Sequence, residues 1–270
     1  MEQYIFYLFI FMIGTVFGSF FTLAVYRIPL KQDITHERSY CPKCNHKLSF
    51  FDMIPILSYI FLGGKCRYCK EKIRIRYLLL EILTGTVFLL FAMSLNVSFD
   101  NLEIHKLAHL LFGFLYIAGM IIIAGIDKER KNINKNVVIY EMIIICLYMV
   151  YLYVVEKTNI YRYAIYLFML FVFIVVENIY LKKKLKDNYT LQILELSMIM
   201  TIFTKEITYV ATVILTLLTI ATGQIAKKML KKESDYKNLP FGFYLICSNI
   251  ISFIIVNFIT CGWIIWEKWI

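Results

Sequence analysis

The chain has 270 residues, of which 60% are hydrophobic and 18% are charged, with a mean hydropathy of +0.68 and a formal net charge of +10. A water-soluble domain usually has about half apolar residues and about a quarter charged ones. A soluble core of this length cannot bury so much apolar surface. The composition therefore excludes an ordinary soluble globular protein and predicts a protein that lies in a lipid bilayer.

The apolar residues fall into eight segments, and we predict a transmembrane helix in each because backbone polar groups in lipid must be hydrogen-bonded within the segment. The first segment carries no charge and is followed by Arg27-Ile28-Pro29, so we predict a permanent anchor rather than a removable signal peptide. The predicted fold is an all-α integral membrane protein with about eight transmembrane helices. The segments are residues 3–26, 77–95, 107–126, 137–155, 163–181, 189–204, 207–226 and 239–266.

The positive charge gathers in alternate connections between these segments. Residues 27–76 contain eleven lysines and arginines, 127–136 four, 182–188 four and 227–238 five. The positive-inside rule places those four connections in the cytoplasm and both termini outside the cell membrane. The basic character thus follows from the topology, and no nucleic acid partner is required.

The first cytoplasmic connection is the only segment outside the membrane that is long enough to form a module. We therefore divide the chain into a first helix at 1–26, a loop module at 27–76 and a multi-helix membrane core at 77–270. The module contains two C-x-x-C pairs separated by 21 residues, which is typical of a tetrahedral zinc site, and structural disulfides are disfavoured in a reducing compartment. We predict that zinc is bound by four ligands, Cys41, Cys44, Cys66 and Cys69.

Several motifs resemble the type IV prepilin peptidases, and they extend over most of the chain. They begin at Gly18-Ser19-Phe20, continue through the two cysteine pairs to Thr84-Gly85, and end with Leu239-Pro240-Phe241-Gly242. The resemblance implies an intramembrane aspartic endopeptidase that removes the short basic leader of pilin-like precursors after a glycine at the cytoplasmic membrane boundary. Many members also N-methylate the new N-terminus with S-adenosylmethionine. No glycine-rich nucleotide motif is present, so that cofactor rests on the resemblance alone.

Two aspartates lie at the predicted cytoplasmic boundary. Asp127 follows the third apolar segment, and Asp187 precedes the sixth. Paired aspartates hydrolyse peptides by sharing one proton, so that one carboxylate activates water and the other protonates the scissile carbonyl. Read alone, each residue is better explained as an ordinary helix-end carboxylate balanced by nearby lysines. The resemblance implies that Asp127 and Asp187 form the catalytic pair.

The surroundings of Asp187 differ from the family pattern. The family has Gly-x-Gly before this aspartate and a lysine two positions after it, whereas this chain has Lys184-Leu185-Lys186 and Tyr189. Glycines allow helices to approach closely in membranes. A second hypothesis is therefore a catalytically inactive relative that binds pilin-like precursors or acts as an assembly scaffold. A third hypothesis, a transporter or channel with a zinc-bound cytosolic loop, lacks support from inverted repeats or broken helices.

Other acids lie near the cytoplasmic ends of the segments, and an ionisable group in a membrane is a functional candidate by default. Glu81 matches a family position, and we interpret it as a supporting or substrate-handling residue. We interpret Glu141, Glu177 and Glu195 as interfacial residues that reach toward basic neighbours.

Overall fold

The computed structural model describes residues 2–34, 39–99, 103–157, 161–177, 188–204, 206–229 and 239–267. Within these ranges, six helices are long and apolar enough to cross a membrane, and two further apolar helices are shorter. The predicted all-α fold with about eight membrane helices is confirmed. The long helices are α1 (Glu2–Arg27), α3 (Arg76–Ser94), α4 (Ile104–Arg130), α5 (Lys135–Val154), α9 (Glu206–Met229) and α10 (Phe241–Glu267), and the short ones are α6 (Tyr161–Val176) and α8 (Asn188–Phe203).

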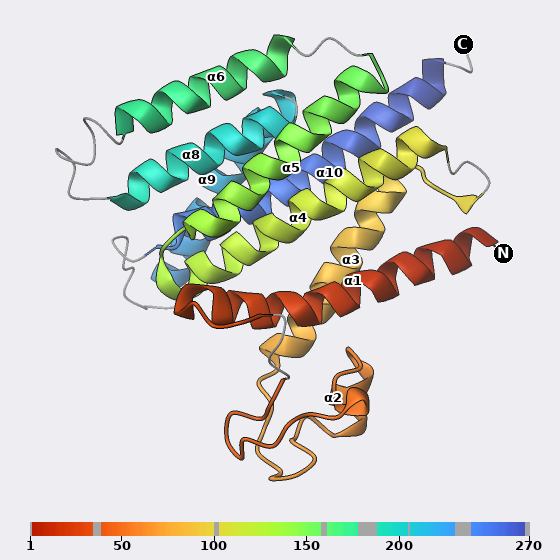
Figure 1. Ribbon diagram of the computed structural model, residues 1–270, viewed down its shortest axis with the longest axis vertical. Coiled ribbons are helices and arrows are strands. Elements are labelled where there is room, and N and C mark those ends of the chain that lie inside the picture. The colour runs from red at the N-terminus through yellow and green to blue at the C-terminus, as the bar shows by residue number, and fades with distance from the viewer. Residues whose placement is uncertain are drawn as a thin grey trace. The chain divides into compact units, whose positions relative to one another are not determined.

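The chain divides into two compact units, one up to Leu110 and one from Leu111 onward. In the first unit, α1 and α3 pack against each other (Figure 1). Glycines form the contact: a Cβ on Gly14 would lie 2.8 Å from the Cα of Gly85, and a Cβ on Gly18 would lie 2.9 Å from the Cα of Glu81. Gly14 and Gly18 form a G-x-x-x-G motif, which allows two helix backbones in a membrane to approach closely.

Over residues 28–34 and 39–75, the loop module between α1 and α3 contains only short elements. They are the 3-10 turns η1 (Ile28–Leu30) and η2 (Phe50–Asp52) and the five-residue helix α2 (Leu57–Phe61). Asp52 organises the polar interior, because its carboxylate accepts hydrogen bonds from Ser49, from the Arg67 guanidinium at 2.6 Å and from the Tyr68 hydroxyl at 3.3 Å. Burial tends to raise the pKa of Asp52, but the hydrogen bonds from Arg67 and Ser49 outweigh it and lower that pKa.

The second unit is a helical bundle with a buried polar network. The Tyr116 hydroxyl of α4 donates to Asn249 of α10 at 2.7 Å, and the Asn249 amide donates to the Thr212 hydroxyl of α9 at 3.2 Å. The Tyr116 ring also stacks on Phe203 of α8, with ring centroids 4.1 Å apart. These contacts join four helices in a region where unsatisfied polar groups are costly, so they fix how the helices pack.

Candidate active site and metal centre

Asp127 lies in the last turn of α4, inside the helix rather than after it as the predicted boundary at 126 had placed it. Its side chain is fully buried. The Oδ2 atom accepts a hydrogen bond from the backbone N–H of Phe243 at 2.8 Å and another from the Tyr189 hydroxyl at 3.0 Å. The Oδ1 atom is also buried but has no hydrogen-bond partner among the described residues. One carboxylate oxygen is thus held by two donors, while the other is buried without a partner in the described part of the chain.

The start of α10 supplies the backbone donor. Pro240 directly precedes the helix, and the amides of the first helical turn have no acceptor within the helix. The Phe243 amide therefore donates to Asp127, while the Gly242 amide donates to the Tyr189 hydroxyl at 3.1 Å. A Cβ on Gly242 would lie 3.0 Å from Oδ2 of Asp127, so the absence of a side chain allows this approach. The positive end of the α10 dipole thus meets a carboxylate.

Tyr189 is the residue that sequence reasoning missed. It had been noted only because it replaces a lysine of the family pattern. In the structure it lies in the first turn of α8 and contacts both Asp127 and the start of α10. The only signal in the sequence was its position two residues after Asp187. Asp187 itself lies outside the described residues, so its pairing with Asp127 stays a prediction.

Glu141 corrects a second interpretation. We expected an interfacial carboxylate, but its side chain is fully buried in α5, and neither oxygen has a hydrogen-bond partner in the described part of the chain. A Cβ on Gly119 of α4 would overlap the Oε1 atom of Glu141. The missing side chain at Gly119 therefore makes the space for this carboxyl group. The expectation of a basic neighbour was wrong because the residue faces α4 instead of the membrane boundary.

Glu81, which we interpreted from the sequence as a supporting or substrate-handling residue, connects α3 to the loop module. It lies in the second turn of α3, is 9% exposed, and its Oε2 accepts the backbone N–H of Ile56 at 2.8 Å. Ile56 has φ = +61°, a conformation that β-branched residues rarely adopt. Glu81 therefore holds the strained residue that precedes α2.

The two cysteine pairs of the loop module have the same local structure. In the first pair, the Cys41 N–H donates to the His46 carbonyl at 3.0 Å, and the Asn45 N–H donates to the Cys41 carbonyl at 2.8 Å. In the second pair, the Cys66 N–H donates to the Glu71 carbonyl at 2.8 Å, and the Lys70 N–H donates to the Cys66 carbonyl at 3.0 Å. The residue after each second cysteine, Asn45 or Lys70, has a positive φ. Each turn therefore presents two thiols from one side.

These two turns bring the four predicted ligands together. All four sulfur atoms lie within 4.8 Å of one another, and the sulfurs of Cys41 and Cys69 are 3.8 Å apart. In a tetrahedral site with metal–sulfur bonds of about 2.3 Å, the sulfur–sulfur edges are about 3.8 Å. The cluster thus has the size that a four-thiolate metal site requires, and the predicted grouping is confirmed.

The thiols of the cluster differ in acidity. Burial tends to raise the pKa of Cys41, but backbone hydrogen bonds from Cys44 and Lys43, together with the neighbouring thiols, lower it to about 7. At Cys69 a backbone hydrogen bond from Glu71 lowers the pKa, while burial and the other thiols outweigh it and raise the pKa to about 11. The cluster therefore stabilises a thiolate at Cys41, and a thiolate is the form that binds metals.

Comparison with known proteins supports the resemblance seen in the sequence. Residues 12–95 match the family described as the Bacterial Peptidase A24 N-terminal domain. Similar proteins include the prepilin leader peptidase/N-methyltransferases of Myxococcus xanthus, 43% identical over 31% of this chain and 25% of that protein, and of Neisseria gonorrhoeae, 33% identical over 46% of this chain and 49% of that protein. The enzyme of that name from Vibrio cholerae is 39% identical over 30% of this chain and 35% of its own length. No solved structure matches.

The matched region covers a quarter to about half of these relatives. The match to the family model, residues 12–95, includes α1 from Met12 onward, the loop module and α3, and thus all four clustered cysteines. The predicted resemblance is confirmed for this part of the chain.

Proposed function

We infer that this chain, which belongs to the prepilin peptidase family through residues 12–95, removes the leader from pilin-like precursors. Its relatives carry the name prepilin leader peptidase/N-methyltransferase, which supports this substrate class. The reaction is hydrolysis of one peptide bond after a glycine at the cytoplasmic membrane boundary. Residues 77–270 form the peptidase core, and residues 27–76 form a separate loop module.

Asp127 and Asp187 share the catalysis. One carboxylate takes a proton from water while the other, holding the shared proton, donates it to the oxygen of the scissile carbonyl. We assign this task to Oδ1 of Asp127, because donors from Tyr189 and Phe243 already occupy Oδ2, whereas Oδ1 has no partner among the described residues. Fixed donors on one oxygen orient the carboxylate, so its second oxygen is presented in one direction.

The contact between Tyr189 and Asp127 carries the proposal. Tyr189 follows Asp187 by two residues, and two residues of extended chain span at most about 7 Å. The covalent chain therefore keeps the Cα of Asp187 within about 7 Å of the Cα of Tyr189, whose side chain donates a hydrogen bond to Asp127. This connection supports the pair even though the family's glycines are absent before Asp187.

The catalytic face lies on the cytoplasmic side of the cell membrane, and both termini lie outside. The lysines and arginines in alternate connections support this orientation. A precursor with a basic leader in the cytoplasm and an apolar segment in the membrane then presents its junction to Asp127.

Zinc bound by Cys41, Cys44, Cys66 and Cys69 has a structural role in this proposal, because four sulfurs leave no open position for substrate. When bound, the ion supplies folding energy to a segment too small to bury a core of its own. The names of the relatives also support N-methylation of the new N-terminus with S-adenosylmethionine. The proposal assigns no residues to that cofactor.

Co-expression with a pilin-like precursor from the same genome tests the catalytic pair. Leader removal is measured as a mass change of the precursor, for wild type and for Asp127→Asn and Asp187→Asn. A matched control is Glu129→Gln, because Glu129 is an exposed acid at the same end of α4. We expect cleavage by wild type and by the control, and none by either aspartate variant. Cleavage that survives Asp187→Asn would contradict the pair, and cleavage that survives Asp127→Asn would contradict the site.

The inactive-scaffold alternative has a specific observation in its favour. Tyr189 occupies the position of a lysine in the family pattern, and the family's glycines are absent before Asp187. In that case wild type leaves the precursor uncleaved but co-purifies with it. The same co-expression experiment therefore separates the peptidase from the scaffold.

A further inference from the structure

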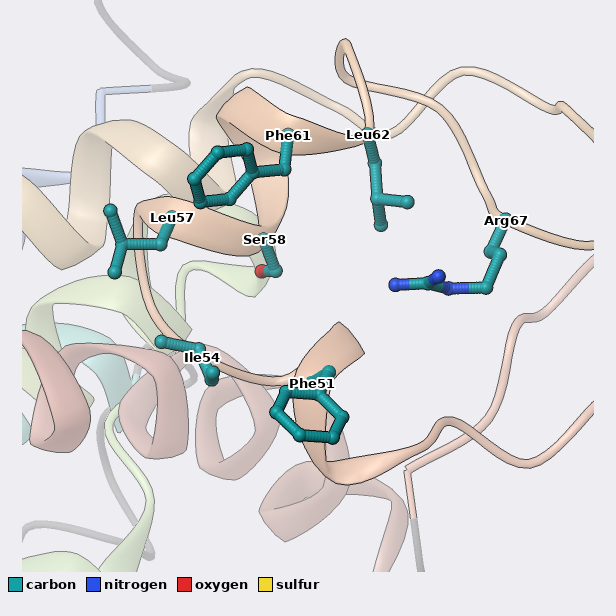
Figure 2. Close-up of a pocket in the computed structure, with 7 residues that line it drawn as sticks. All are labelled: Phe51, Ile54, Leu57, Ser58, Phe61, Leu62 and Arg67. Atoms are coloured by element: carbon teal, nitrogen blue, oxygen red, sulfur yellow. The ribbon is translucent and has the colours of Figure 1, made fainter.

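The loop module has an apolar segment that is exposed rather than packed. The side chains of Phe50 and Phe51 in η2 are 72% and 70% exposed, and those of Ile60 and Phe61 in α2 are 60% and 82% exposed. A groove of about 300 Å³ lies between the two elements. Figure 2 shows Phe51 on one wall, Phe61 and Leu62 on the other, and Arg67 at one end. We call residues 50–61 the apolar segment.

The apolar segment is held at the end of a membrane helix. The backbone N–H of Ile56, which directly precedes α2, donates to Glu81 in the second turn of α3. Because α3 is a candidate membrane span that begins at Arg76, this bond places the start of α2 beside the end of the span. The strained conformation of Ile56 is maintained by this bond, so the placement is specific to the fold.

The charge of the module complements an anionic surface. Residues 39–76 contain eight lysines and arginines and only two acids. One acid, Asp52, is buried and paired with Arg67. Several basic side chains are exposed around the cysteine turns: Lys43, Lys47, Lys65, Lys70 and Lys72. Basic residues next to a membrane span are attracted to anionic lipid headgroups.

We propose that the apolar segment inserts into the headgroup region of an anionic membrane leaflet and so fixes the loop module against the bilayer. Phenylalanine and isoleucine side chains at 50–51 and 60–61 enter the boundary between headgroups and acyl chains, while the lysines stay among the phosphates. Amphipathic surface elements bind membranes through this combination of apolar contact and charge. The attachment through Ile56 and Glu81 sets the depth. The proposal does not depend on the peptidase activity.

Photocrosslinking in the full-length chain tests this contact. A photoreactive benzoylphenylalanine replaces Phe61, and in a matched control it replaces Tyr40, an exposed aromatic residue of the same module. The protein is reconstituted in nanodiscs of phosphatidylcholine with phosphatidylglycerol, or of phosphatidylcholine alone. Mass spectrometry then identifies the adducts. We expect lipid adducts at position 61 at a severalfold higher yield than at position 40, and a further increase with the anionic lipid.

If the apolar segment contacts a protein instead of lipid, the probe gives protein adducts. A crosslink from position 61 to a second copy of the chain, or to a co-reconstituted pilin-like precursor, would overturn the proposal. Equal lipid yields at positions 61 and 40 would also overturn it, because they would indicate mere proximity to the membrane. A further variant, Phe51→Glu with Phe61→Glu, changes only exposed side chains and is expected to remove most lipid adducts of a probe at Ile60. Unchanged yield in that variant would count against insertion.

Discussion

The hydroxyl of Tyr189 donates a 3.0 Å hydrogen bond to Oδ2 of Asp127, so α8 and α4 meet at a buried carboxylate. The Gly242 amide of α10 donates to the same hydroxyl, and the next amide donates to the carboxylate itself. Three helices thus share one polar centre. Any change to the hydroxyl alters both the orientation of Asp127 and the start of α10.

Removal of that hydroxyl tests its role in orienting Asp127. In Tyr189→Phe, Oδ2 keeps the Phe243 amide and loses one hydrogen bond, which is worth about 1 kcal/mol, or about fivefold in rate. We expect leader cleavage to slow by about that factor without a loss of protein in the membrane. Tyr209→Phe in α9 is the control, because no hydrogen bond of the Tyr209 hydroxyl is found in the described residues. Equal rates for both variants would contradict an orienting role.

The glycine contact between α1 and α3 predicts a stability effect. In Gly18→Ala the new methyl group meets the α3 backbone at Glu81, where no flexible side chain can move aside. Overpacking of this kind costs about 1–3 kcal/mol, so the thermal unfolding temperature in detergent should fall.

Gly223→Ala in α9 provides the matched comparison, because a Cβ there meets nothing within 4 Å. The same substitution in an open helical position should stabilise the protein by about 0.5–1 kcal/mol. An unfolding temperature of Gly18→Ala equal to or above that of wild type would contradict the close backbone contact between Gly18 and Glu81.

The buried carboxyl of Glu141 predicts a gain in stability. Its two oxygens lack partners in the described residues, and an unpaired buried polar group costs about 1–3 kcal/mol. Glu141→Met replaces the carboxyl with an apolar group of similar length beside Gly119. We expect a higher thermal unfolding temperature. A lower temperature, together with reduced leader cleavage, would instead indicate that the carboxyl has a partner or a functional role.

The cysteine cluster predicts metal content. The purified protein should contain about one zinc ion per chain, measured by atomic emission, as a single tetrahedral site requires. Cys44→Ser should lose the ion, because three thiolates bind it less tightly than four. His46→Ala should retain it, since the His46 ring contacts the Tyr68 ring, with centroids 3.6 Å apart, and His46 is not a member of the four-cysteine cluster. Metal-free wild type, or metal loss in His46→Ala, would contradict this assignment.

The sequence predicted the parts of the structure that depend on strong local patterns. The apolar runs located the helices to within a few residues, because lipid leaves a backbone few other conformations. The cysteine spacing predicted the grouping of the four cysteines, since each C-x-x-C pair is a self-contained turn. Glu141 was misjudged, because the pattern of one helix does not reveal the gap that Gly119 leaves on another. Tyr189 was missed for the same reason, as its partner lies 62 residues earlier.

The two ends of the loop module leave from α1 and α3, which are joined at Gly18 and Glu81. The entropy lost on closing a flexible loop rises with the length of free chain between its ends. In the intact protein the packed helices already hold the two ends of the module together before any ion binds. In a synthetic peptide of residues 27–76 the ends are free, so metal binding must itself offset the entropy of closing the loop. Metal affinities measured on such a peptide will understate the affinity of the whole protein. A graft of the module onto another scaffold will need two closely spaced attachment points.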